Sequence, residues 1–303
     1  MAHKRQRRNC VKISSGKIYT LVYAIAHTIF FFYYSIQCLT THYLLLPECF
    51  SKDKKEVMLD AAANSNNALK NFLLAALPAA EFAHVSSKLE PVSFKLGEVL
   101  YESGDKLDCV YFPTTAIASL LYVMENGATA EIGVIGNDGI SGHALFLGGD
   151  SMSNRALIQS AGDAYRMSAK DLKAEFALGG VFQKILLRYT QALMTQISQT
   201  AVCNRLHTLE QQLCRWLLLS HDRLNSDKLV MTHDLISNML GVRREGVTLA
   251  AQKLAKKNLI KNVRGTITVI DRQGLEEAVC ECYEVVNTEY NRLLGRGMSR
   301  TFG

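Results

Sequence analysis

The sequence lacks the short motifs that mark the common classes of enzyme and metalloprotein. Its eight cysteines contain no Cys-x-x-Cys pair, and Cys280 and Cys282 alone provide too few ligands for a structural zinc ion. No P-loop and no nucleophile elbow occurs in the 303 residues. His84 and His143 are isolated, so no closely spaced histidines indicate a metalloenzyme. We therefore predict that the protein is not an enzyme, holds no metal and keeps its cysteines as reduced thiols.

Charge is missing from residues 18–47, and the mostly apolar stretch 18–36 is long enough to span a bilayer. Six basic residues precede it, so a real anchor would place the rest of the chain outside the cytoplasm. The alternative is that residues 1–57 are a leader that is not native, with translation starting at Met58 after the purine-encoded run Lys54-Lys55-Glu56. We favour this second interpretation. It predicts a cytoplasmic protein, with a membrane as partner only if the leader is real.

The formal net charge of +6 comes entirely from this leader, and the remaining residues carry a separation of charge. Residues 58–175 hold 8 basic and 14 acidic side chains, whereas residues 176–271 hold 13 basic and 6 acidic ones. Hydrophobic residues make up 48% of the chain and charged residues 20%, which fits about two folded domains. An acidic half joined to a basic half indicates separate tasks, and the basic half is the candidate for binding nucleic acid.

Residues 58–179 are predicted to form a small β-domain after two short helices at 68–77 and 79–89. Short apolar runs separated by Gly, Asn and Asp predict strands at 92–94, 99–101, 110–112, 117–123, 130–135, 156–159 and 164–167. Asn126-Gly127 between two of these runs is a strong hairpin signal. Ser168 and Asp171 then resemble a capping box that opens the next helix. Many short strands at this spacing indicate a jelly-roll β-barrel.

Residues 180–206 predict a long dimerisation helix. Residues 189–204 carry no charge, and such a helix would be poorly solvated alone. A seam at 3-4-3-4-3 spacing, suited to a parallel partner helix, runs through Leu186, Tyr189, Leu193, Gln196, Thr200 and Cys203. The alternative is that these side chains are buried against the chain's own β-domain. We favour the homodimer.

Residues 207–271 predict a winged helix-turn-helix, followed by a C-terminal helix and tail at 272–303. Thr232 suits the N-cap of a helix at 233–240, Gly241-Val242 breaks that helix, and a second helix begins near Arg243. A β-hairpin that turns at Arg264-Gly265 completes the unit. In such a unit the N-terminal residues of the second helix meet base edges in the major groove.

The candidate DNA-binding side chains divide into two kinds. Arg can bind guanine through two hydrogen bonds and Glu can accept from cytosine, whereas Lys suits phosphates. The candidates are Thr232, Arg243, Arg244, Glu245, Thr248, Lys253, Lys257 and Arg264.

Residues 231–245, which read MTHDLISNMLGVRRE, resemble the helix-turn-helix of the Crp/Fnr family of bacterial transcription regulators. The order of a cyclic-nucleotide-binding-type barrel, a long helix and a winged helix resembles that family over about residues 70–271. The resemblance implies an α+β fold and a regulator that binds a pseudo-palindromic operator in double-stranded DNA as a homodimer. It also implies contact with RNA polymerase if the protein is an activator. Arg244-Glu245 matches the family's base-reading pair, whereas Leu249 replaces a further base-contacting Arg, so we expect a different operator.

The nucleotide-binding positions depart from those of the cAMP-binding members. In those members a Gly-Glu pair binds ribose and an Arg-Ser pair binds phosphate, whereas this chain has Gly142-His143 and Arg155-Ala156. The retained Arg155 would still suit an anionic effector of unknown identity. We predict that the chain binds no cAMP and no cofactor. The clustered N-terminal cysteines of the family's iron–sulfur oxygen sensors are also missing.

Two other functions are open from the residues alone. One is a membrane-anchored sensor that uses the barrel to bind a ligand or partner. The other is a barrel enzyme, which the isolated histidines do not favour.

Overall fold

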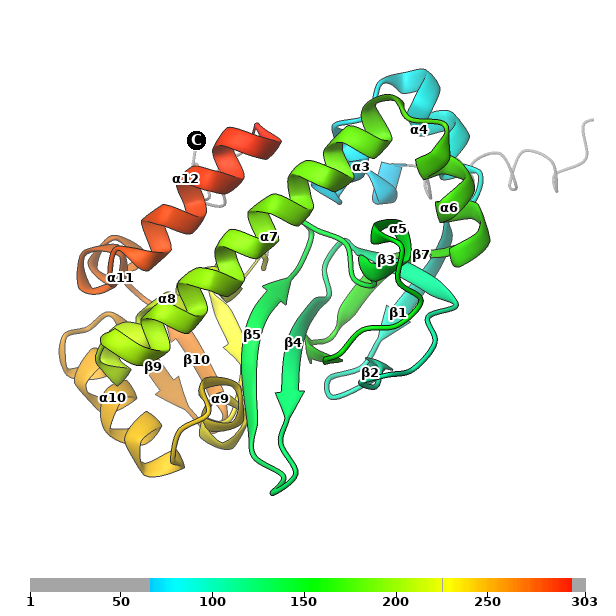
Figure 1. Cartoon of the computed structure of the whole chain (residues 1–303). Helices are drawn as coiled ribbons and strands as arrows, with labels where there is room; N and C mark the ends of the chain where they lie inside the picture. Colours follow the sequence, from blue (N-terminus) through cyan, green and yellow to red (C-terminus); the bar gives the residue numbers. More distant parts are fainter. Residues whose placement is uncertain (1–65, 225, 296–303) are drawn as a thin grey trace, which may run out of the picture. The chain divides into compact units, whose positions relative to one another are not determined.

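The computed structural model describes residues 66–224 and 226–295, which belong to one compact unit, Ala62–Gly303 (Figure 1). The leader at 1–57 and the start at Met58 lie outside the described residues, so the choice between anchor and leader stays a prediction. Among the helices that the structure describes, none is long and apolar enough to cross a membrane.

The acidic half of the chain folds into two antiparallel sheets. Strands β1 (Glu90–Phe94), β7 (Gly162–Ser168) and β3 (Cys109–Pro113) form one sheet in the order β1-β7-β3. The other has the order β2-β6-β4-β5, with β2 at Val99–Tyr101, β6 at Arg155–Ser160, β4 at Ile117–Val123 and β5 at Thr129–Ile135. All seven predicted strands are present, with ends moved by no more than two residues. Two sheets of short strands are the arrangement of a jelly roll, as predicted.

Local signals fix the ends of several elements. Gly127 adopts φ 81° in the turn between β4 and β5, which confirms the hairpin at Asn126-Gly127. The hydroxyl of Ser168 accepts a hydrogen bond from the Asp171 amide at 3.0 Å, which confirms the start of α6 (Ala169–Ala177). Helices α3 (Phe72–Ala75) and α4 (Ala79–Ser86) are shorter than predicted, and α4 ends early because the chain already enters β1 at residue 90.

Helix α7 (Gly180–Leu206) confirms the predicted long helix, but its predicted dimer seam is wrong. All six seam side chains are buried within the chain's own fold, at most 7% exposed. Gln196 shows the covering elements, because its side chain accepts from the Val134 amide of β5 at 2.7 Å and donates to the Tyr290 hydroxyl at 3.0 Å. The alternative of burial against the chain's own domains therefore holds for these residues.

One residue further along α7, a second row with the same 3-4-3-4-3 spacing is available. A step of one residue turns the row by about 100° around the helix. Leu187, Met194, Ala201 and Asn204 are exposed, and Thr190 and Ile197 are half-buried. The row consists of Leu187, Thr190, Met194, Ile197, Ala201 and Asn204, and we call it the outer row of α7. It carries no charge.

The basic half contains α8 (Leu209–His221), α9 (His233–Leu240) and α10 (Arg244–Lys256). Its small sheet has the order β8-β10-β9, formed by Lys228–Val230, Thr266–Val269 and Ile260–Val263. Two helices follow where one was predicted, α11 (Arg272–Ala278) and α12 (Cys282–Leu294). Figure 1 shows α12 running beside α7, and the Gln196–Tyr290 hydrogen bond joins these two helices.

The β-domain and the basic half are joined by buried polar contacts. The Arg223 guanidinium, after α8, donates to both carboxylate oxygens of Asp138, at 3.0 and 2.6 Å. Trp216 of α8 donates to the carboxylate of Glu131 on β5 at 3.0 Å, and burial raises the pKa of Glu131 to about 7. A further contact lies at the surface, where the Thr129 hydroxyl donates to the Asn238 carbonyl of α9 at 2.9 Å.

Candidate nucleic-acid interface

Helices α9 and α10 form the predicted helix-turn-helix. The Thr232 hydroxyl accepts from the Leu235 amide at 3.1 Å, which confirms it as the N-cap of α9. Gly241 ends α9 with φ 66°, a left-handed conformation that glycine adopts without strain. Ile236, Met239, Val247 and Leu254 are buried between the helices, so the opposite face of α10 remains accessible.

The N-terminal end of α10 presents a group of exposed side chains. Arg243 is the N-cap residue, and Arg244 and Glu245 open the first turn. All three are exposed. The Arg244 Nε lies 3.3 Å from a carboxylate oxygen of Asp234 on α9, and both side chains are 63% exposed. An ion pair this exposed is worth about 1 kcal/mol or less, so the guanidinium can exchange this partner for a base edge.

Thr248 lies one turn further along α10, and its hydroxyl is already used within the protein. It donates to the Arg244 carbonyl at 3.0 Å and lies 2.9 Å from the His233 Nδ1. The other ring nitrogen of His233 lies beside the Asn262 amide of β9. This chain of contacts ties α9, α10 and the wing together, so Thr248 has a structural role whether or not it also meets DNA.

The basic candidates further along have different surroundings. Lys257 bonds the Glu210 carboxylate at 2.6 Å, and the other Glu210 oxygen lies 3.8 Å from the Lys253 ammonium. Glu210 thus compensates part of the charge of both lysines. Arg264 forms the tip of the wing with Gly265, both at positive φ, 44° and 78°. This confirms the two-residue turn between β9 and β10.

Leu249 adds an apolar side chain to the exposed face of α10. It is 60% exposed, a large fraction for a leucine in a folded domain. An apolar side chain in the major groove can contact the methyl group of thymine. The sequence showed that an arginine was missing at this position, and the structure shows that its replacement is presented to solvent.

The candidate ligand residues of the β-domain are held by the protein itself. Gly142 has φ 92°, and a Cβ there would lie 3.2 Å from Val110. Burial lowers the pKa of His143 to about 4, and its Nδ1 has no hydrogen-bond partner among the described residues. Arg155 donates two hydrogen bonds of 2.7 Å to the Glu102 carboxylate, and Ala156 is fully buried. The candidate anion-binding Arg therefore already has a carboxylate partner.

One group of side chains was not found from the sequence. Cys280 and Cys282 lie with Cys203 and His207, and the four ligand atoms are within 4.8 Å of one another. The only sequence signal was the C-terminal Cys-x-Cys pair. The other two residues lie 73 to 79 positions earlier in the chain, so no local motif connects them.

Comparisons with known proteins agree with this architecture. Residues 91–177 match the cyclic nucleotide-binding domain and residues 211–278 match the Crp-like helix-turn-helix domain, together about half of the chain. No curated protein sequence matches the chain.

Solved structures extend the likeness to the whole arrangement. A Crp/Fnr-family protein from Eubacterium rectale has a TM-score of 0.54 at 16% identity, over 68% of this chain and 96% of that one. FixK2 from Bradyrhizobium japonicum has a TM-score of 0.54 at 14% identity, over 63% and 98%. A CRP-family transcriptional regulator from Thermus thermophilus has a TM-score of 0.52 at 14% identity, over 69% and 98%. With both domain matches present in the same chain and in this order, the protein belongs to the Crp/Fnr family of transcription regulators.

Proposed function

We propose that the protein is a cytoplasmic transcription regulator that binds a pseudo-palindromic DNA operator as a homodimer. The observation that carries this proposal is the exposed N-terminal end of α10, where Arg243, Arg244 and Glu245 lie together without a covering element. Two arginines and a glutamate at the start of a recognition helix supply the donors and the acceptor that read G·C pairs in the major groove. If the protein is an activator, RNA polymerase is a further partner.

Base reading and phosphate binding are separated by two substitutions. The probe is an operator selected from a random duplex library with the purified protein. Arg244→Ala should weaken binding to that operator by about 1–3 kcal/mol and relax the preference at one base pair. Lys257→Ala should weaken binding to every duplex alike and flatten the dependence on salt. Gel shifts in which Arg244→Ala keeps full discrimination would contradict the assignment of α10 as the reading helix.

The dimer in this proposal uses the outer row of α7. Leu187, Met194 and Ala201 recur every seven residues on a face without charge, the spacing of a coiled-coil seam. Met194 is 63% exposed in the single chain, a large apolar side chain that a partner helix would cover. Two copies joined along α7 would place their recognition helices about 34 Å apart, one turn of DNA.

A matched pair of variants tests this interface. Met194→Glu places a charge in the seam, and we expect monomers in light scattering. Met124 is equally exposed, at 60%, but lies in the β4–β5 hairpin, so Met124→Glu is the control and should stay dimeric. A Met194→Glu protein that remains dimeric would place the interface elsewhere.

The sensor domain is proposed not to bind cAMP. The Arg155–Glu102 ion pair, the apolar side chain of Ala156 and the neutral ring of His143 support this proposal, since none offers an unpaired positive charge to a phosphate. Calorimetry with cAMP and cGMP should give no binding, and micromolar binding would contradict it. Glu102→Gln would free Arg155 and tests whether the ion pair is what excludes an anion.

A further inference from the structure

Four potential metal ligands meet where α7 ends and the DNA-binding domain begins. Cys203 lies in the last turn of α7, His207 is the C-cap residue of that helix, and Cys280 and Cys282 lie at the junction of α11 and α12. The Cys203 and Cys280 Sγ atoms are 3.5 Å apart, and the Cys282 Sγ is 3.6 Å from the His207 Nδ1. These contacts join segments separated by more than 70 residues.

We propose that Cys203, His207, Cys280 and Cys282 bind one Zn²⁺ ion. Three cysteines and one histidine are a standard ligand set for a closed, tetrahedral structural zinc site. Ligands about 2.3 Å from one ion at tetrahedral angles lie about 3.8 Å apart, close to the two distances given above. The three thiols are at most 3% exposed and the His207 side chain is 15% exposed, so the site is enclosed by protein.

The surroundings of His207 fit a zinc ligand. Its Nδ1 faces Cys282, and its Nε2 lies 3.3 Å from the carboxylate of Glu281. A zinc-bound histidine commonly donates its second ring N–H to a carboxylate, which fixes the orientation of the ring. The side-chain amide of Gln212 also donates to the carbonyls of Cys203 and His207, at 3.4 and 2.9 Å. The turn that carries two of the ligands is thus held from α8.

The charge of the region also fits. Three thiolates and one Zn²⁺ ion carry a net charge of −1, which a neighbouring cation would compensate. Arg215 of α8 is 3% exposed, donates to the Thr200 hydroxyl at 3.2 Å, and has an Nε without a partner among the described residues. Thr200 lies about one turn before Cys203 on α7, so this hydrogen bond places the guanidinium near the cluster. A buried cation without full pairing is costly, and a negative metal cluster would relieve that cost.

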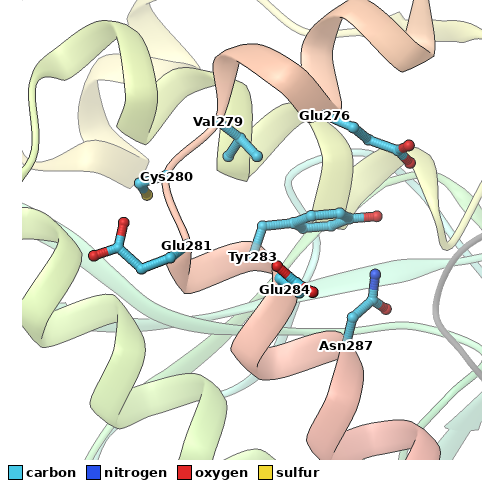
Figure 2. A pocket seen from close by; sticks show the side chains of 7 residues that line it. All are labelled: Glu276, Val279, Cys280, Glu281, Tyr283, Glu284 and Asn287. Carbon is cyan, nitrogen blue, oxygen red and sulfur yellow. The ribbon is translucent and has the colours of Figure 1, made fainter.

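An acidic pocket lies next to the cluster. It has a volume of about 390 Å³ and is lined by Cys280, Glu276, Glu281 and Glu284, together with Val279, Tyr283 and Asn287. Figure 2 shows Cys280 and Glu281 on the loop that enters α12, with Glu276 and Glu284 on the helices on either side. Carboxylates at this opening would attract a divalent cation, so the pocket is a suitable path for zinc to reach the thiols.

The position of the site gives it a structural consequence. Bound zinc would fix the last turn of α7 to the loop before α12, and α12 packs along α7. Because the ligands come together only in the folded chain, the binding free energy of the metal would add to the stability of this junction. The ion would therefore fix the end of α7 relative to the DNA-binding domain. Zinc binding at this cluster does not depend on the proposed operator binding, since metal content is measured without DNA.

The test is the metal content of the full chain, purified with a reductant and supplied with Zn²⁺. Mass spectrometry of the elements should find about one zinc per chain. Cys282→Ser should lose that zinc. Cys214→Ser is the matched control and should keep the metal. Cys214 is buried like Cys282, but it lies in α8 and outside the cluster. Cys282→Ser protein that retains the full equivalent would overturn the proposal.

Two further measurements do not rely on a variant that removes a ligand. Titration of the unmodified protein with Co²⁺ should give the absorption of a tetrahedral thiolate site, and its absence would overturn the proposal. Glu281→Gln should weaken zinc binding about 10–100-fold in competition with a chelator, whereas Glu284→Gln, in the first turn of α12, should not. A Cys203–Cys280 disulfide that persists in the unmodified protein after addition of a reductant and Zn²⁺, detected by thiol counting, would also overturn it.

Discussion

Removal of the negative charge of Asp138 should weaken the contact between the β-domain and the DNA-binding domain and lower the stability of the chain. Asp138 precedes the short helix α5 (Ala144–Leu147), in the loop after β5, and pairs with Arg223 at the end of α8. The side chains are 6% and 1% exposed, so water does not replace a lost partner. The variant Asp138→Asn keeps the size of the side chain and removes the carboxylate charge to which the Arg223 guanidinium donates two hydrogen bonds.

The expected magnitude follows from burial. Removal of one partner of a buried ion pair costs about 3–5 kcal/mol. For a chain of this size each kcal/mol lowers the melting temperature by about 2–4 °C, so we expect a fall on the order of 10 °C. Gly136 shows how closely the Arg223 side chain is packed, because a Cβ at that position would lie 2.8 Å from it. The backbone of the loop after β5 is therefore packed directly against the arginine.

The control is an ion pair of similar geometry on the surface. Arg166 and Glu90 also pair at 2.7 Å, but their side chains are 51% and 65% exposed. Glu90→Gln should cost less than about 1 kcal/mol. Both variants are compared with the unmodified protein by thermal unfolding. If Asp138→Asn and Glu90→Gln lower the melting temperature equally, this prediction is wrong, because burial would then not determine how much an ion pair contributes to stability.

Three other predictions follow from single contacts. Burial raises the pKa of Glu131 to about 7 from an ordinary value of 4.5, so the folded state holds an extra proton between these values. The stability that this proton contributes should be complete below pH 4.5 and be lost as the pH rises through about 7, a loss of about 3 kcal/mol. Glu131→Gln should remove this pH dependence in denaturant titrations at several pH values. Thr208→Ala removes the side chain that caps α8 in a capping box with Gln211, and should cost about 1 kcal/mol in the same titrations; no change would show that the box is dispensable. Glu210→Gln removes the carboxylate charge that pairs with Lys253 and Lys257. In fluorescence anisotropy it should tighten DNA binding and steepen the dependence of affinity on salt concentration. An unchanged salt dependence would place both lysines away from the phosphates.

Local signals in the sequence predicted the elements well. Asn126-Gly127, Ser168 and Thr232 fix a turn or a helix start through contacts within a few residues, and the structure has each of them as predicted. The exposed start of α10 could equally be predicted from the sequence, because the apolar positions of that helix already define which face is exposed.

The error on α7 shows what a pattern cannot supply. Two rows with the same spacing run along this helix, one residue apart, and neither carries a charge. The sequence favoured the row through Tyr189 and Gln196 for a partner helix. The structure places that row against β5 and α12, which leaves the row through Met194 exposed.

The sequence by itself determined the order of the parts, the strands, the helix-turn-helix and the separation of charge. Each of these depends on residues close together in the chain. The tertiary structure alone decided which face of α7 is free, that Arg155 is paired with Glu102, and that Cys203 and His207 join Cys280 and Cys282. Such pairings depend on how distant segments pack, because long-range contacts leave no spacing in the sequence. The same packing turned two apparently isolated cysteines into half of a candidate zinc site.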